Sequence, residues 1–125
     1  MSVKVDIAEL SGALADYSYA YLVTVGDDYR AHTVAVDPSL ADGVLSITGV
    51  GRRTGDNATR HTAVTLAYPP RDGGGYTLIV DGQADVSGDT LTITPNGAVL
   101  HRRKSAGTAA TATGCGDDCV PLSGE

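Results

Sequence analysis

Six short segments of this chain have the residue usage of β-strands, and they recur at regular intervals along most of its length. They are rich in valine, threonine and other strand-favouring residues, and glycine, aspartate and proline mark the turns between them. Such a pattern predicts a mainly β domain whose antiparallel strands form a six-stranded barrel rather than a sandwich. The six segments are 19–25, 30–36, 44–48, 63–68, 76–86 and 90–94.

Small helices are expected at three places between or after these strands. Residues 6–17 carry apolar side chains at helical spacing, and a second short helix is expected to begin near Thr54. Residues 95–104 are expected to form a last helical turn. Gly82 lies inside the longest strand, where a glycine commonly marks a bend.

The composition is that of one ordinary globular domain of 125 residues, with 42% hydrophobic and 19% charged residues. Phe and Trp are absent, so aliphatic residues must form the core and six Tyr supply the aromatic area. A net charge of -6 argues against nucleic acid or an anionic membrane as a partner. Without a long apolar stretch or a signal peptide, the chain is expected to be a soluble cytoplasmic protein.

The two cysteines lie in a C-terminal segment that differs from the rest of the chain. Residues 1–104 are expected to form the barrel domain, and residues 105–125 a flexible Ala/Thr/Gly linker followed by a tail with Cys115 and Cys119. One cysteine pair supplies only half of a tetrahedral metal site. The tail is therefore interpreted as carrying labile thiols, with a metal site completed by a second chain or by His101 as the alternative.

The loop after the third predicted strand concentrates positive charge in an acidic protein. Its run 49–57 reads Gly-Val-Gly-Arg-Arg-Thr-Gly-Asp-Asn, which places Arg52 and Arg53 at the expected start of a helix. Free backbone N–H groups at a helix start, together with guanidinium groups, form a receptor for a phosphate monoester. The alternative is that both arginines are solvated and pair with Asp56 or another nearby carboxylate.

Short motifs stand in a recognisable order from this loop onward, and the first begins within it. The run 53–57 (Arg-Thr-Gly-Asp-Asn) is followed by 64–66 (Val-Thr-Leu), and 82–86 reads Gly-Gln-Ala-Asp-Val. Together with the helix, hairpin and third strand before them, these motifs resemble the pyridoxamine 5'-phosphate oxidase-like family of flavin and deazaflavin oxidoreductases. The resemblance covers about residues 5 to 100. It implies the FMN-binding split-barrel fold and a homodimer, as in a small member of actinobacterial type.

The resemblance also implies a coenzyme, flavin mononucleotide or a deazaflavin, bound along the sheet at the dimer interface. Its ring would supply the redox chemistry, so no catalytic acid or base is assigned. The expected phosphate ligands are Arg52, Arg53, Thr54 and Asn57. The residues expected to line the ring are Val34, Ala35, Val36, Thr48 and Gly49.

Three functions remain open at this point. The first is an oxidoreductase that passes hydride or electrons to a small molecule. The second is a coenzyme-binding module without turnover, and the third is a structural or interaction protein with a metal in the cysteine tail. His32 alternates with two valines, so it either faces the coenzyme pocket or forms an ordinary hydrogen bond at the sheet surface, which is the commoner role.

Overall fold

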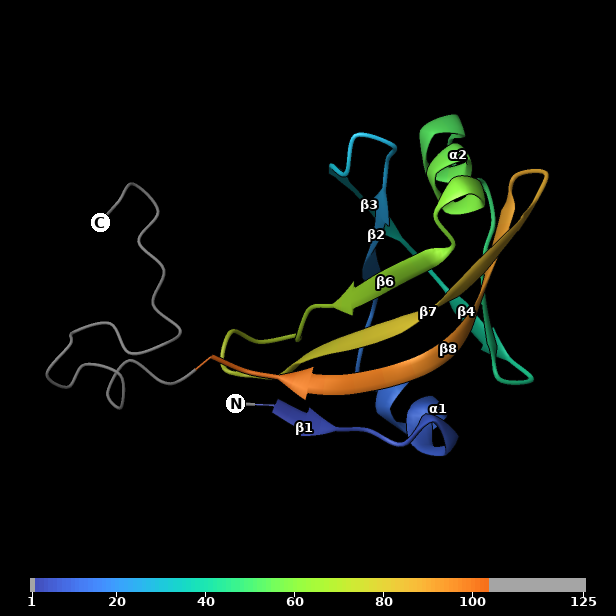
Figure 1. The fold of residues 1–125 in the computed structure, drawn as a ribbon. Helices are drawn as coiled ribbons and strands as arrows, with labels where there is room; N and C mark the ends of the chain where they lie inside the picture. Colours follow the sequence, from blue (N-terminus) through green and yellow to red (C-terminus); the bar gives the residue numbers. More distant parts are fainter. Residues whose placement is uncertain (1, 104–125) are drawn as a thin grey trace, which may run out of the picture.

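The computed structural model describes residues 2–103, which form a strongly curled antiparallel sheet with small helices at two opposite ends (Figure 1). The helices are the 3-10 helix η1 (Ile7–Glu9), α1 (Leu10–Leu14) and α2 (Arg52–Arg60). The strands are β1 (Ser2–Lys4), β2 (Ala20–Val25), β3 (Ala31–Val36), β4 (Ser39–Ala41), β5 (Val44–Ile47), β6 (Ala63–Tyr68), β7 (Thr77–Ser87) and β8 (Thr90–His101). Their order in the sheet is β3-β2-β6-β7-β8-β5-β4, and β1 pairs with β8.

The prediction of a mainly β, antiparallel fold is confirmed, but the sheet has eight strands where six were expected. The two additional strands, β1 and β4, have three residues each, which is too short for an alternating pattern to be read. The helical turn expected at 95–104 is wrong. β8 continues through that segment to His101 because β7 and β1 hydrogen-bond to its two edges.

The long β7–β8 hairpin gives the sheet its curl. β7 pairs with β6 and β8 pairs with β5, so the hairpin joins the two halves of the half-barrel. A register shift between Asp81 and Gly82 marks a β-bulge, which bends the hairpin as expected at Gly82. A Cβ at Gly82 would lie 2.5 Å from Ile93 Cγ2 and 2.6 Å from the Thr94 carbonyl oxygen, so only glycine fits there.

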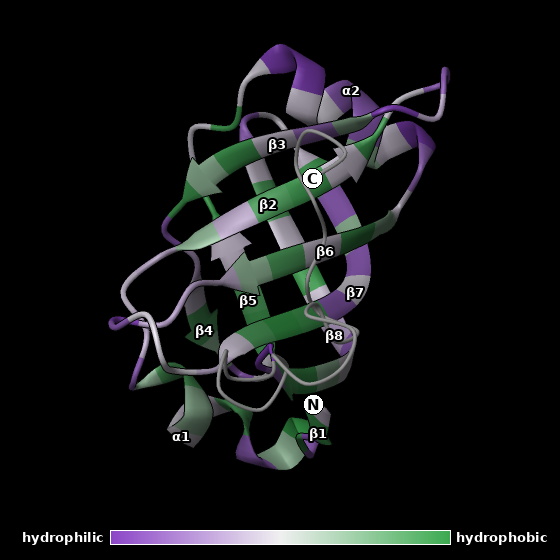
Figure 2. Ribbon diagram, turned by 90° about the vertical axis from the view of Figure 1, so that its left-hand side faces the viewer, coloured by the Kyte–Doolittle hydropathy of each residue, from purple (hydrophilic) through white to green (hydrophobic). Residues whose placement is uncertain are grey.

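The core fills the inside of the curl with aliphatic side chains. Alternate residues of β2, β6, β7 and β8 are buried, as expected for strands with one face in the core. Figure 2 shows hydrophobic residues along the strands and hydrophilic ones on α2. The largest fully buried side chains are Leu10, Leu22, Leu45, Leu66, Leu78, Leu91, Ile93, Val80 and Thr24.

Tyr68 closes the core at the end of β6. Its ring packs edge-on against Tyr17 with centroids 5.9 Å apart, and the Tyr17 hydroxyl donates to the Tyr76 carbonyl oxygen at 2.8 Å. The Tyr68 hydroxyl is buried and forms no hydrogen bond within residues 2–103. Burial raises the pKa of this phenol to about 12, so it is neutral at physiological pH.

Tyr68→Phe is expected to raise the free energy of unfolding by about 1 kcal/mol at pH 7, because it removes an unsatisfied buried hydroxyl. Wild-type stability should fall as the pH rises from 10 toward 12, since the phenol ionises more readily in the unfolded chain. The Tyr68→Phe variant should lose less stability over the same pH range. Urea unfolding at neutral and alkaline pH measures both effects, with Tyr29→Phe, at an 86% exposed position, as the control. A Tyr68→Phe variant less stable than wild type at pH 7 would contradict the argument.

Candidate functional site

A cavity of about 540 Å³ opens where the half-barrel fails to close. One wall is β3, which ends the strand order and, within residues 2–103, pairs only with β2. The other wall is the connection from β5 to α2 together with the first turn of α2. We call this space the seam cavity. Its lining residues are His32, Val34, Ala35, Val36, Asp37, Ile47, Thr48, Gly49, Val50, Gly51, Arg52, Arg53 and Thr54.

The structure places most of the sequence-predicted site residues around this one cavity. The residues that line it are Val34, Ala35, Val36, Thr48, Gly49, Arg52, Arg53 and Thr54. Asn57 is the exception. It is buried against β2, where its Nδ2 donates to Thr24 Oγ1 at 3.2 Å. Asn57 therefore fixes α2 to β2 and does not line the seam cavity.

The start of α2 makes one end of the cavity cationic. Gly51 is the extended N-cap, and no side chain among residues 2–103 caps the helix, so the first N–H groups of α2 have no acceptor from the helix itself. Arg52 and Arg53 are exposed and form no ion pair within residues 2–103. The alternative pairing with Asp56 is therefore absent from the described part of the chain. Two unpaired guanidinium groups and a helix N-terminus can bind an anion.

The remainder of the cavity is less charged. Val34 and Val36 of β3 are half-buried and face inward, opposite Leu22 and Ala20 of β2. Ile47, at the end of β5, is buried beside them. Asp37, just after β3, is the one carboxylate in the lining. The cavity therefore joins a cationic end to an apolar strip, which suits a ligand with a phosphate and a flat ring.

The loop from β5 to α2 is held in place by its backbone. Gly49 has φ of 72°, a left-handed conformation that favours glycine, and it turns the chain out of β5. The next residue, Val50, donates its N–H to the Asp89 carbonyl oxygen at 3.0 Å, which fixes the loop to the β7–β8 turn. This anchoring presents the first turn of α2 to the cavity in one position.

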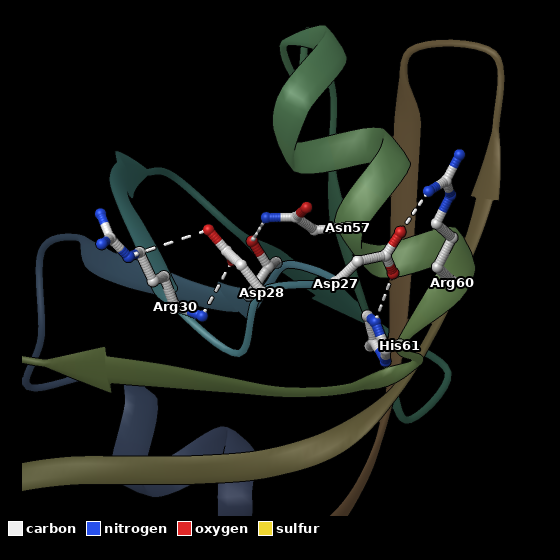
Figure 3. A network of polar contacts seen from close by, with 7 residues as sticks. Asp27, Asp28, Arg30, Asn57, Arg60 and His61 are labelled. Atoms are coloured by element: carbon white, nitrogen blue, oxygen red, sulfur yellow. Dashed lines mark hydrogen bonds and ion pairs between the residues drawn. The ribbon is translucent and has the colours of Figure 1, made fainter.

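Asp27 holds the other end of α2 (Figure 3). Its carboxylate accepts hydrogen bonds from Arg60 Nη1 and from His61 Nε2, the latter at 2.8 Å. The His61 hydrogen bond, and then the Arg60 hydrogen bond, lower the pKa of Asp27 below its usual value. Asp27 lies in the turn between β2 and β3. No local pattern links it to residues 33 and 34 positions away.

Asp27→Asn is expected to lower the melting temperature by about 2 °C at pH 7, because an exposed pair contributes little. Asp27 with a lowered pKa stabilises the fold above about pH 4, and this contribution disappears as the pH falls through the folded-state pKa. The difference between wild type and variant should therefore shrink in acid. Thermal unfolding monitored by circular dichroism at several pH values measures it, and a difference that grows in acid would refute the assignment.

The described part of the chain contains neither a cluster of metal-binding side chains nor a helix suited to cross a membrane. Within residues 2–103 there is no group of three or more His, Cys, Asp and Glu side chains that could hold a metal ion. Cys115 and Cys119, the weak metal candidates, lie outside the described residues, as does the linker. None of the helices in that part of the chain is long and apolar enough to span a bilayer.

Two mycobacterial proteins are similar to this chain over nearly its whole length. They are uncharacterized proteins of Mycobacterium bovis and Mycobacterium tuberculosis, each 43% identical, with the match covering 96% of this chain and 96% of the relative. The chain belongs to their family. No family model matches it.

Solved structures with the same fold have much lower sequence identity. An FAD-binding protein from Mycobacterium smegmatis superposes with a TM-score of 0.63 at 16% identity, covering 82% of this chain and all of the other. An F420 reductase gives 0.54 at 17% identity, over 74% and 92% of the two chains. A candidate pyridoxamine 5'-phosphate oxidase from Listeria innocua gives 0.55 at 12% identity, over 78% and 94%. The chain therefore has the same curled half-barrel fold as these solved structures, as the resemblance implied.

Proposed function

We propose that this protein binds flavin mononucleotide or a deazaflavin coenzyme in the seam cavity and passes hydride or electrons to a small molecule. The observation that carries the proposal is that one cavity joins an apolar strand face to a helix N-terminus with two arginines that form no ion pair within residues 2–103. A volume of about 540 Å³ is within the range of cofactor sites. The fold it shares with an FAD-binding protein and an F420 reductase supports the choice of coenzyme class.

Each wall of the cavity has a distinct task in this proposal. Arg52, Arg53 and Thr54 hold the phosphate, using guanidinium groups and the free N–H groups of the first turn of α2. Asn57 supports that turn through Thr24 rather than binding the phosphate itself. The residues that line the ring are Val34, Ala35, Val36, Thr48 and Gly49.

The chain's contribution to the reaction is binding, orientation and exclusion of water. A flavin or deazaflavin ring supplies hydride or electron transfer when it is bound. Val34 and Val36 keep the ring's surroundings apolar, and the anchored β5–α2 loop fixes the phosphate relative to them. The anchored loop and the edge strand therefore set the orientation of the ring.

We further propose that the protein acts as a homodimer with the coenzyme at the interface. The seam cavity lies at an edge strand, so a second copy could complete its wall. Tyr19 and Tyr21 form an exposed edge-on pair next to β3, with side chains 38% and 39% exposed. Sedimentation equilibrium should give twice the 12.7 kDa chain mass.

Titration with coenzymes tests the proposed function directly. FMN, the deazaflavin coenzyme F420 and riboflavin are added separately, and quenching of each ligand's fluorescence is followed. FMN or F420 should bind with a micromolar or lower Kd, and FMN should bind at least about tenfold more tightly than riboflavin, which lacks the phosphate. Absence of binding by both FMN and F420 would refute the proposal.

A coenzyme-binding module without turnover is the second candidate. Among residues 2–103, the cavity lining contains no cysteine, lysine, glutamate or serine, so the lining side chains are suited mainly to binding. Reduction of the bound coenzyme followed by addition of small-molecule acceptors separates the two functions. Reoxidation faster than that of free coenzyme supports an oxidoreductase, and an unchanged rate supports a binding module. Zinc bound without any coenzyme would instead support an interaction protein with a metal in its cysteine tail.

A further inference from the structure

His32 is the one histidine that lines the seam cavity. It lies on β3 directly opposite Thr24 of β2, and both belong to the inward face of the sheet. Thr24 is fully buried and His32 is half-buried, so the imidazole stands at the boundary between the core and the cavity. The position is polar in a strand whose other inward residues are Val34 and Val36.

Contacts among β2, β3 and α2 connect this position to the cationic end of the cavity. Thr24, the neighbour of His32 across the ladder, accepts the hydrogen bond from Asn57 of α2. Arg53 lies one helical turn before Asn57, and residues four apart share a helix face. His32 is therefore at the end of β3 that faces the first turns of α2, and not at the Asp37 end.

We propose that His32 is a third, pH-dependent ligand for the phosphate group bound at the start of α2. This inference rests on the proposed function and adds to it a dependence of affinity on pH. A protonated imidazole adds one positive charge and an N–H donor beside the two guanidinium groups, and a neutral one adds at most a single hydrogen bond. The affinity for the phosphate should therefore rise as the pH is lowered and the imidazole takes up a proton.

The other charged groups near His32 leave this role open. The Asp27 carboxylate accepts hydrogen bonds from Arg60 and His61. The Asp28 carboxylate accepts a hydrogen bond from the backbone N–H of Arg30 and forms an ion pair with its side chain. His32 itself forms no ion pair with any residue of the range 2–103. The charged groups on the surrounding elements are Asp27, Asp28 and Arg30 in the β2–β3 turn, Asp37 after β3, Arg52, Arg53, Asp56 and Arg60 on α2, and His61 after it.

The test compares the Kd of FMN for wild type and His32→Gln near pH 5.5 and near pH 8. The variant should bind about tenfold more weakly at the lower pH and within about twofold of wild type at the higher pH. At each pH, the Kd of the variant is divided by the Kd of wild type, and this ratio cancels the titration of the FMN phosphate itself. His101→Gln is the matched control, because His101 bonds Ser2 Oγ at 3.1 Å and does not line the cavity. It should give a ratio near one at both pH values.

A second measurement uses only the wild-type protein, so it does not depend on a variant that folds. Proton NMR follows the His32 Cε1–H resonance through a pH titration with and without inorganic phosphate. Phosphate should move the midpoint of His32 to higher pH and leave that of His101 in place. A midpoint that does not move would overturn the proposal.

The outcomes separate this inference from the proposed function. If FMN or F420 binds and the His32→Gln ratio is the same at both pH values, the role of His32 is refuted and the coenzyme site stands. If neither coenzyme binds but phosphate moves the His32 midpoint, the coenzyme function is refuted and the three-ligand anion site stands. If neither coenzyme binds and the midpoint is fixed, both are refuted.

Discussion

Replacing both Arg52 and Arg53 by alanine is expected to weaken FMN or F420 binding at least about a hundredfold. Hydrogen bonds to charged groups contribute about 1.5–3 kcal/mol each, and a hundredfold change in Kd corresponds to about 2.7 kcal/mol. Both side chains are exposed and form no ion pair within residues 2–103, so their loss should leave the free energy of unfolding unchanged. Fluorescence titration and urea unfolding measure the two quantities.

The matched control removes the same charge elsewhere. Arg71→Ala with Arg103→Ala takes two exposed arginines from positions that do not line the seam cavity. This variant should bind coenzyme within about twofold of wild type, since neither side chain is in the cavity and exposed charges are screened by salt. Equal affinity in the two double variants would remove the phosphate site from the start of α2, whatever coenzyme binds elsewhere.

The seam cavity shows which parts of a site can be predicted from sequence. Arg52, Arg53 and Thr54 are contiguous, and a glycine-bounded basic run before a helix has a local physical meaning. Val34 and Val36 could be placed on one face because strand side chains alternate. The basic run and the two valines face each other across the cavity only because of the way the sheet curls. Only the ordered resemblance to a known family suggested it.

Other features depend on contacts between distant residues, which no local pattern reports. Asn57 lies within the basic motif, yet its amide turns to Thr24, 33 residues away, and becomes part of the packing of α2. The segment 95–101 has short apolar runs that suit a helix, but β7 and β1 offer two open edges to it. The pairing of β8 on both edges decides its conformation, and tertiary context commonly overrides propensity in this way.

Gly82→Ala is expected to lower the free energy of unfolding by about 3 kcal/mol. The added Cβ would lie 2.5 Å from Ile93 Cγ2 and 2.6 Å from the Thr94 carbonyl oxygen, and the second contact is with backbone that cannot rotate away. Relief requires the bulge between Asp81 and Gly82 to open, and β7 and β8 would then separate where their hairpin bends. Equilibrium unfolding in urea measures the loss.

Gly97→Ala is the matched control because it changes the same hairpin by the same methyl group. Gly97 pairs with Asp81 just beyond the bulge, and a Cβ added there meets nothing within 4 Å. Its stability should change by less than about 0.5 kcal/mol. If the two variants were equally stable, the bend would not need a glycine. If Gly82→Ala alone is destabilised and also binds coenzyme more weakly at temperatures where it remains folded, then the curl set by one glycine also sets the seam cavity between β3 and α2.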